Sequence, residues 1–216
     1  MSLTIYGIGA SRASRPLWTA LELGLSFQHV PTPYAGGATR TPEYLAINPN
    51  GHIPAVVDER PEGRVVVWES MACALYLARH HGKADGVSIA PATPYEDAQA
   101  LRWSFWAASE AEADALTVLM HRMVMPADQR KPELADAAER RLAVPFRVIE
   151  AELTAAQARG HAWLAADRFT VADLLVATVL GWARMSGPLM QAHPVTAEWL
   201  GRCVARPGFA QARGMA

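Results

Sequence analysis

The sequence predicts an α/β domain over residues 1–82 followed by an all-α domain over residues 94–216. Three observations support this division. In the first domain, short apolar runs typical of strands alternate with helical patterns. No convincing strand pattern follows Pro91, and helix start signals take over from there. Between the two lies the segment KADGVSIAPAT, residues 83–93, which we interpret as the linker.

The first domain is expected to fold in the order β-α-β, a loop, then β-β-α. The run LTIY at residues 3–6 predicts a short buried strand. In PLWTALEL, residues 16–23, apolar side chains recur at helical spacing, and Gly24 is a natural C-cap. The later elements are a strand at residues 27–30, two strands at residues 55–57 and 65–68 joined by DERPEG, and a helix at residues 70–81.

Capping signals mark two helix starts in the second domain. Thr93-Pro94-Tyr95-Glu96 is a capping box with proline at the first helical position, and it predicts the start of a long helix. Thr170-Val171-Ala172-Asp173 is a second box, preceded by Phe169 as a hydrophobic staple. It opens a nearly all-apolar helix that should be buried on all sides. Further helices are expected at residues 132–159, with a bend at Pro145, and at residues 195–205.

Composition limits the classes of protein to which this chain can belong. With 51% hydrophobic and 19% charged residues, it is expected to fold as a soluble globular protein. Its net charge of −1 gives no overall attraction to nucleic acid or to an anionic membrane. Two cysteines without paired spacing, no secretory signal and no run of about 18 apolar residues indicate a cytoplasmic protein.

The stretch NPNGHIPAVVD, residues 48–58, places Pro54 between strong turn formers and the start of a strand. Proline cannot donate to a strand ladder, and at an X-Pro bond the cis form costs only about 1 kcal/mol or less. A cis bond would turn the backbone amide and carbonyl of Ile53 away from the sheet, where an extended peptide could pair with them. The alternative is a trans proline on an edge strand.

Taken together, these patterns resemble the glutathione S-transferase family. NPNGHIPAVVD stands before the third strand and WESMACALYLAR follows the fourth. The resemblance covers nearly the whole chain and includes GASRASRPLWTALELGL, FTVADLLVATVLGW and WLGRCVARPGF. It implies a thioredoxin-like first domain with a cis-proline at Pro54, followed by an all-α domain.

The resemblance also implies a glutathione site in the first domain, with no metal. Ile53, before Pro54, would pair its backbone with the cysteinyl part of glutathione, and Glu69 and Ser70 would hold the γ-glutamyl end. Local physics agrees, because the amides at a helix start favour a carboxylate, and Ser70 can cap its helix as well. His52 stands near the expected glycyl carboxylate, where the family often has lysine or glutamine. The alternative for His52 is a surface turn residue.

Glutathione transfer needs the thiolate, and the pKa of the free thiol is expected near the cysteine value of about 8.5. A hydrogen-bond donor at the sulfur lowers that pKa. In the family this donor is a tyrosine, a serine or sometimes a cysteine after the first strand. Pro16 must lie in the first turn of its helix, which makes Ser14 the expected N-cap and leaves Ser11 in the preceding loop. Ser11, four residues before Arg15, fits the SxxxR pattern of serine-type members and is the expected catalytic residue.

Other groups fit the donor role less well. Tyr6 lies too early, at the end of the first strand. No cysteine falls between residues 8 and 16, which disfavours thiol-dependent chemistry. The remaining alternative is that Ser11 is only a loop residue and that Ser14 supplies the donor.

The electrophile is expected to bind against the helical domain. Trp103 and Trp106 share one face of the predicted long helix, and Trp106 is the expected second-substrate residue. Core packing is the alternative for both aromatic side chains. Family members are usually two-fold homodimers, which suggests a homodimer here.

The sequence therefore predicts a cytoplasmic glutathione S-transferase that conjugates the glutathione thiolate to small hydrophobic electrophiles, a detoxification reaction. Neither nucleic acid nor a membrane is an expected partner. Two alternatives stay open on the same fold. One is a glutathione-dependent reductase or dehalogenase, and the other is a non-catalytic module that binds proteins.

Overall fold

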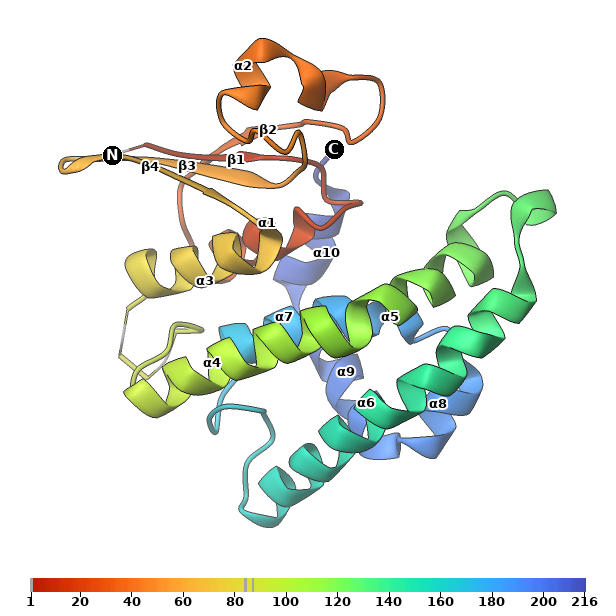
Figure 1. The fold of residues 1–216 in the computed structure, drawn as a ribbon. Helices are drawn as coiled ribbons and strands as arrows, with labels where there is room; N and C mark the ends of the chain where they lie inside the picture. Colours follow the sequence, from red (N-terminus) through yellow and green to blue (C-terminus); the bar gives the residue numbers. More distant parts are fainter. Residues whose placement is uncertain (1, 84, 87) are drawn as a thin grey trace. The chain divides into compact units, whose positions relative to one another are not determined.

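The structure is a computed structural model that describes residues 2–83, 85–86 and 88–216. It contains two compact units, one of residues 1–92 together with 206–216 and one of residues 93–205 (Figure 1). The sequence places residues 206–216 with the helical domain, whereas the structure joins them to the α/β unit. Residues 84 and 87 of the expected linker lie outside the described residues.

A mixed sheet with strand order β2-β1-β3-β4 forms the base of the first unit. Its strands are β1 (Ser2–Tyr6), β2 (Gln28–Val30), β3 (Ala55–Arg60) and β4 (Gly63–Trp68). β1 runs parallel to β2 and antiparallel to β3, and β3 and β4 form an antiparallel hairpin. Helices α1 (Ser14–Glu22) and α3 (Ser70–His81) lie together on one face, and the short α2 (Pro42–Leu45) lies beyond β2 (Figure 1).

Burial explains why these segments form strands. Leu3 and Ile5 of β1 are buried on alternate positions, the spacing that one covered face of a sheet requires. Residues 55–58 of the central strand β3 are all buried, as expected of a strand covered on both faces. The hairpin is longer than the sequence suggests, because pairing continues to Arg60 opposite Gly63. Much of DERPEG is therefore strand rather than turn.

Residues 206–216 pack on α1 through specific contacts. Arg206 donates two hydrogen bonds to the Glu22 carboxylate, from Nε to Oε1 at 3.0 Å and from Nη2 to Oε2 at 2.6 Å. Within helix α10 (Pro207–Gly214), the Phe209 ring packs edge-on against Trp18, with centroids 5.0 Å apart. An ion pair and an aromatic contact to α1 are the physical reason why this segment belongs to the first unit.

The second unit is helical throughout its described elements. Its α-helices are α4 (Pro94–Trp106), α5 (Glu112–Leu119), α6 (Pro132–Ala158), α7 (Val171–Leu180), α8 (Gly187–Ala192) and α9 (Pro194–Val204). The long helix expected from Pro94 is interrupted, because residues 107–111 and 120–124 are π-helical. Every residue of α7 is buried, as its apolar sequence predicts. Pro145 lies inside α6.

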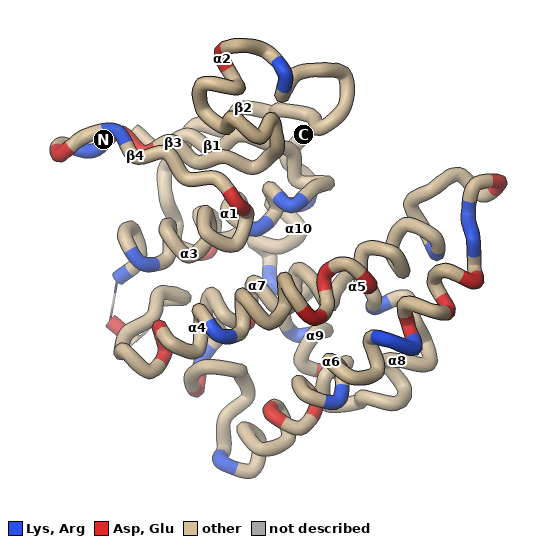
Figure 2. Tube along the Cα trace, viewed as in Figure 1, with Lys and Arg blue, Asp and Glu red and all other residues tan. Residues whose placement is uncertain are grey.

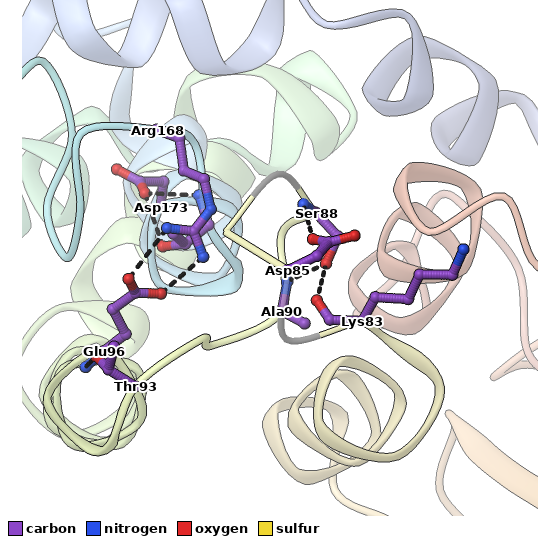
Figure 3. Close-up of polar contacts among 9 residues, drawn as sticks. Lys83, Asp85, Ser88, Ala90, Thr93, Glu96, Arg168 and Asp173 are labelled. Carbon is purple, nitrogen blue, oxygen red and sulfur yellow. Dashed lines mark hydrogen bonds and ion pairs between the residues drawn. The ribbon is translucent and has the colours of Figure 1, made fainter.

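Polar contacts fix the helix starts of the second unit, as Figure 3 shows for α4. The Thr93 hydroxyl accepts a hydrogen bond from the Glu96 amide at 3.2 Å. The Arg168 guanidinium donates to both carboxylate oxygens of Glu96, at 3.1 and 2.7 Å. In the linker segment of the first unit, the Ser88 hydroxyl donates to the Lys83 carbonyl at 2.8 Å.

Positively and negatively charged residues are interspersed along both units (Figure 2). Many are paired, as Arg141 is with Asp114 at 2.6 Å and Arg122 with Glu139 at 3.0 Å. In the described part of the chain, no helix combines the length and apolar character needed to span a membrane.

Asp58 is the centre of a buried polar cluster between β3 and α3. Its Oδ2 accepts from the Tyr76 hydroxyl at 2.7 Å and from Arg60 Nε at 2.8 Å, and lies 2.7 Å from His81 Nε2. Burial alone would raise the pKa of Asp58. The hydrogen bonds from Tyr76 and His81 and the charges of His81 and Arg60 outweigh burial and hold that pKa below its ordinary value of 3.8.

We expect Asp58 to make the protein sensitive to acid. Because its pKa is lowered in the folded state, its contribution to stability is full above the unfolded pKa of about 3.9 and is lost as the pH falls through the folded pKa. Asp58→Asn should therefore reduce the loss of stability between about pH 5 and pH 2, measured by urea unfolding. The exposed Asp128→Asn should leave that loss unchanged. If Asp58→Asn lost as much stability as the wild type between about pH 5 and pH 2, Asp58 would not be the source of the acid sensitivity.

Candidate functional site

The loop at residues 7–13 connects β1 to α1 and carries Ser11. Gly7 opens it at φ 133°, and a Cβ at this position would lie 2.5 Å from the Ala13 Cβ. Two contacts from β2 hold the start of the loop. The Gly7 amide donates to the Val30 carbonyl at 3.1 Å, and His29 Nε2 donates to the Gly7 carbonyl at 2.7 Å.

Ser11 is half-buried in this loop, with its hydroxyl fixed on both sides. Its Oγ donates to the Ile8 carbonyl at 2.7 Å and accepts from the Ala13 amide at 3.1 Å. The prediction that Ser14 caps α1 is wrong. Ala13 is the N-cap and already has helical dihedral angles, so Ser14 is the first helical residue and Ser11 accepts the amide hydrogen bond instead.

The turn before β3 holds the predicted Ile53-Pro54 element, and the peptide bond between these residues is cis. The Tyr44 hydroxyl and Asn48 Nδ2 both donate to the His52 carbonyl at 2.7 Å. Burial raises the pKa of Tyr44 to about 12, so its hydroxyl keeps the proton that it donates. Within the described chain, the Ile53 amide and carbonyl have no hydrogen-bond partner. The hydrogen bonds from Tyr44 and Asn48 thus fix the turn, and the Ile53 amide and carbonyl are left available for pairing.

The start of α3 carries Glu69 and Ser70. Glu69 is the N-cap at φ 71°, a left-handed conformation that costs a non-glycine residue about 1–3 kcal/mol. Such strain persists where the surrounding structure holds it and is typical of functional sites. Ser70 is 6% exposed, and its Oγ accepts from Arg15 Nη1 at 2.7 Å. The amides of the first turn of α3 form a site that suits an anion.

Two arginines at the site were not assigned a role from the sequence alone. Arg15 is 1% exposed and joins α1 to the start of α3 through its hydrogen bond to Ser70. The sequence signal that could have assigned it a role was its place in the SxxxR pattern. Arg40 is exposed, and its Nη1 donates to the Asn50 carbonyl at 3.3 Å, within two residues of His52. It brings a positive charge to the turn where His52 is exposed. No local pattern in the loop PTPYAGGATR pointed to Arg40.

Two aromatic residues weighed from the sequence lie in different units. Tyr6 packs edge-on against Tyr44, with centroids 6.0 Å apart, which is a packing role. Trp106 belongs to the second unit, where it is half-buried and lies edge-on to Trp103 at 5.1 Å. Its role in binding a second substrate stays a prediction. Among the described residues, no three His, Cys, Asp or Glu side chains gather as a set of metal ligands.

The amino-acid sequence matches both halves of one protein family. Residues 1–79 match "Glutathione S-transferase, N-terminal domain", and residues 112–207 match "Glutathione S-transferase, C-terminal domain". These two matches cover more than half of the chain. The protein belongs to the glutathione S-transferase family.

Similarity to individual family members extends over nearly the full length. The chain is 32% identical to glutathione S-transferase 3 of Zea mays, over 96% of this chain and 91% of that protein. It is 26% identical to GstB of Escherichia coli, over 95% and 94% respectively. The glutathione-bound theta-class enzyme of Xanthomonas axonopodis pv. citri superimposes with a TM-score of 0.82 at 26% identity, over 100% of this chain and 98% of that one. The predicted fold class, an α/β thioredoxin-like domain followed by an all-α domain, is confirmed.

Proposed function

We propose that this protein is a glutathione S-transferase that conjugates the glutathione thiolate to small hydrophobic electrophiles. The observation that carries the proposal is the arrangement of three elements in one unit. These are the unpaired Ile53 backbone beside the cis bond to Pro54, the amides at the start of α3, and the Ser11 hydroxyl at the start of α1. Solved relatives with glutathione bound support the same ligand.

Each element of the proposed site matches one part of glutathione. The Ile53 amide and carbonyl would pair with the cysteinyl backbone as an added strand does. The amides of α3 near Ser70, with Glu69, would hold the γ-glutamyl end, whose carboxylate suits a helix start. His52 would lie by the glycyl carboxylate, and Arg40 adds a cation to the same turn.

Ser11 would activate the bound thiol by donating its hydroxyl hydrogen to the sulfur. That hydrogen is now donated to the Ile8 carbonyl, so activation requires the hydroxyl to turn from Ile8 toward the sulfur. The amide of Ala13 would keep the Ser11 oxygen in place during this turn. A hydrogen bond to the charged form lowers the pKa of the thiol, and the thiolate then attacks the electrophile.

Trp106 would contribute apolar surface to the site of the electrophile, since aromatic side chains dominate the lining of such sites. We also propose a cytoplasmic homodimer. Val66 and Trp68, which are 37% and 40% exposed on the edge strand β4, offer apolar surface for contact between copies. Sedimentation equilibrium would show a mass of one chain if the dimer proposal is wrong.

The test of the proposed function is a titration of glutathione into the protein at pH 7, followed by thiolate absorbance in the ultraviolet. A free thiol of pKa 8.5 is only about 3% ionised at that pH, so a bound thiolate gives a large added signal. S-methylglutathione should bind with similar affinity and give no such signal, because it has no thiol. Conjugation is then measured with an activated aryl halide. Absence of glutathione binding would overturn the proposal and favour a protein-binding module. Ionisation without conjugation would favour a reductase or dehalogenase.

A further inference from the structure

One peptide group in the Ser11 loop is held from outside the loop. The Gly9 amide donates to the Met215 carbonyl at 2.6 Å. The carbonyl of the same peptide group belongs to Ile8, and it accepts from the Ser11 hydroxyl at 2.7 Å and from the Ser11 amide at 3.1 Å. The peptide group between Ile8 and Gly9 therefore stands between Met215 on one side and Ser11 on the other.

The close approach of the two segments is possible only because residue 9 is glycine. A Cβ on Gly9 would overlap the Ala212 carbonyl oxygen and lie 2.9 Å from the Arg213 carbonyl carbon and oxygen. Gly9 does not have a positive φ, so its backbone conformation alone does not call for glycine. Its small size serves the contact with residues 212–215.

The 206–216 segment is itself firmly attached. Arg206 forms its ion pair with Glu22 at the C-terminal end of α1, and Phe209 packs on Trp18 at the middle of that helix. α10 therefore runs along α1 from the ion pair to the loop. The Met215 carbonyl reaches the Ser11 loop from a helix that is fixed elsewhere.

We propose that Met215 is a positioning residue for Ser11, acting through the peptide group between Ile8 and Gly9. The Met215 carbonyl fixes the orientation of that peptide. The Ile8 carbonyl in turn holds the Ser11 backbone through the Ser11 amide at 3.1 Å, and this bond persists when the Ser11 hydroxyl turns toward the sulfur. A donor must lie within a few tenths of an ångström of its productive position, since a displacement of 1 Å can cost about 100-fold in rate. The proposal rests on the proposed role of Ser11 in glutathione activation.

Two shortened chains test the proposal with little other change. A chain that ends at Gly214 keeps α10, the Arg206–Glu22 pair and the Phe209–Trp18 contact, but lacks the Met215 acceptor. The control chain ends at Met215, whose terminal carboxylate still accepts from Gly9. We expect the shorter chain to bind glutathione within about threefold of the control, because the Ile53 and Ser70 elements are unaltered. Its bound thiol should have a raised pKa, by ultraviolet pH titration, and kcat should fall about tenfold.

A Ser11→Ala background distinguishes positioning from general loss of structure. There the shorter chain should show no further rise in the thiol pKa, because the group that Met215 positions is already absent. A thiol pKa that is unchanged or lowered in the chain ending at Gly214 overturns the proposal. So does an equal further rise in the Ser11→Ala background.

Hydrogen exchange of the Gly9 amide gives a readout that needs no glutathione. We expect protection in the control chain and loss of protection in the chain ending at Gly214. Equal protection would show that the Met215 contact does not hold the loop and would overturn the proposal. If instead protection is lost but Ser11→Ala leaves the thiol pKa of the full chain unchanged, the proposed role of Ser11 fails, and with it the positioning role, although the contact itself stands.

Discussion

Ser11→Ala is expected to lower kcat by about 100-fold near pH 7 while leaving glutathione affinity within about threefold of the wild type. The substitution removes one donor aimed at the sulfur, and a donor of this kind is important only when the negative charge forms. The binding elements at Ile53 and at the start of α3 are unaltered. A fall in kcat without a matching rise in Kd identifies a group that stabilises the thiolate rather than one that holds the tripeptide.

The pH dependence sharpens this prediction. Without the donor, the pKa of bound glutathione should rise toward the free value of about 8.5. The rate deficit of Ser11→Ala should therefore shrink as the pH rises above that value, because the thiol then ionises without help. A stopped-flow or steady-state pH profile with an activated aryl halide measures the rate deficit both near pH 7 and above the pKa of the free thiol.

Ser14→Ala is the matched control. Ser14 is also a serine near the start of α1, but it is the first helical residue and is buried, and alanine is favourable in a helix. Its side chain makes no hydrogen bond to another described residue. We expect thiolate absorbance close to wild type in this variant. A large effect in Ser14→Ala together with a small one in Ser11→Ala would move the donor to Ser14.

The order of the elements could be predicted because their signals are local. The helix at residues 70–81 has the predicted bounds, and Thr170 and Asp173 form the predicted capping box. The π-helical segments that interrupt the long helix could not be predicted, since residues 94–124 continue one helical pattern. The contacts that join residues 206–216 to the α/β unit could not be predicted for a similar reason, because pairs such as Arg206 with Glu22 are 184 residues apart.

The candidate site divides in the same way between local and distant information. The turn formers before Pro54 and the strand after it left both a cis and a trans bond open, and the resemblance to the family implied the cis bond that the structure has. The start of α1 was misjudged, because the helical dihedral angles of Ala13 depend on a loop held by β2 and by Met215. Local capping preferences describe an isolated helix. They do not apply to a helix whose first turn is shaped by contacts with other elements.

Asp173→Ala is expected to lower the free energy of unfolding by about 4 kcal/mol, because it leaves several buried donors unpaired at once. Oδ1 accepts from the Leu164 amide at 2.9 Å and from Trp199 Nε1 at 3.0 Å. Oδ2 accepts from the Thr170 amide and hydroxyl, both at 3.0 Å. One fully buried carboxylate thus joins the loop before α7, the α7 start and α9. Urea unfolding of the variant measures the loss.

Asp173→Asn separates the hydrogen bonds from the loss of side-chain volume. The amide keeps the shape of the carboxylate, but its NH₂ group must face either the Leu164 and Trp199 donors or the two donors of Thr170. Asp173→Asn should therefore lower the free energy of unfolding by a large part of the loss expected for Asp173→Ala. The exposed Asp167→Asn, six residues earlier, should cost less than about 0.5 kcal/mol. Equal small losses for Asp173→Asn and Asp167→Asn would mean that Asp173 stabilises the helical unit by filling space, and that its four hydrogen bonds contribute little net stability.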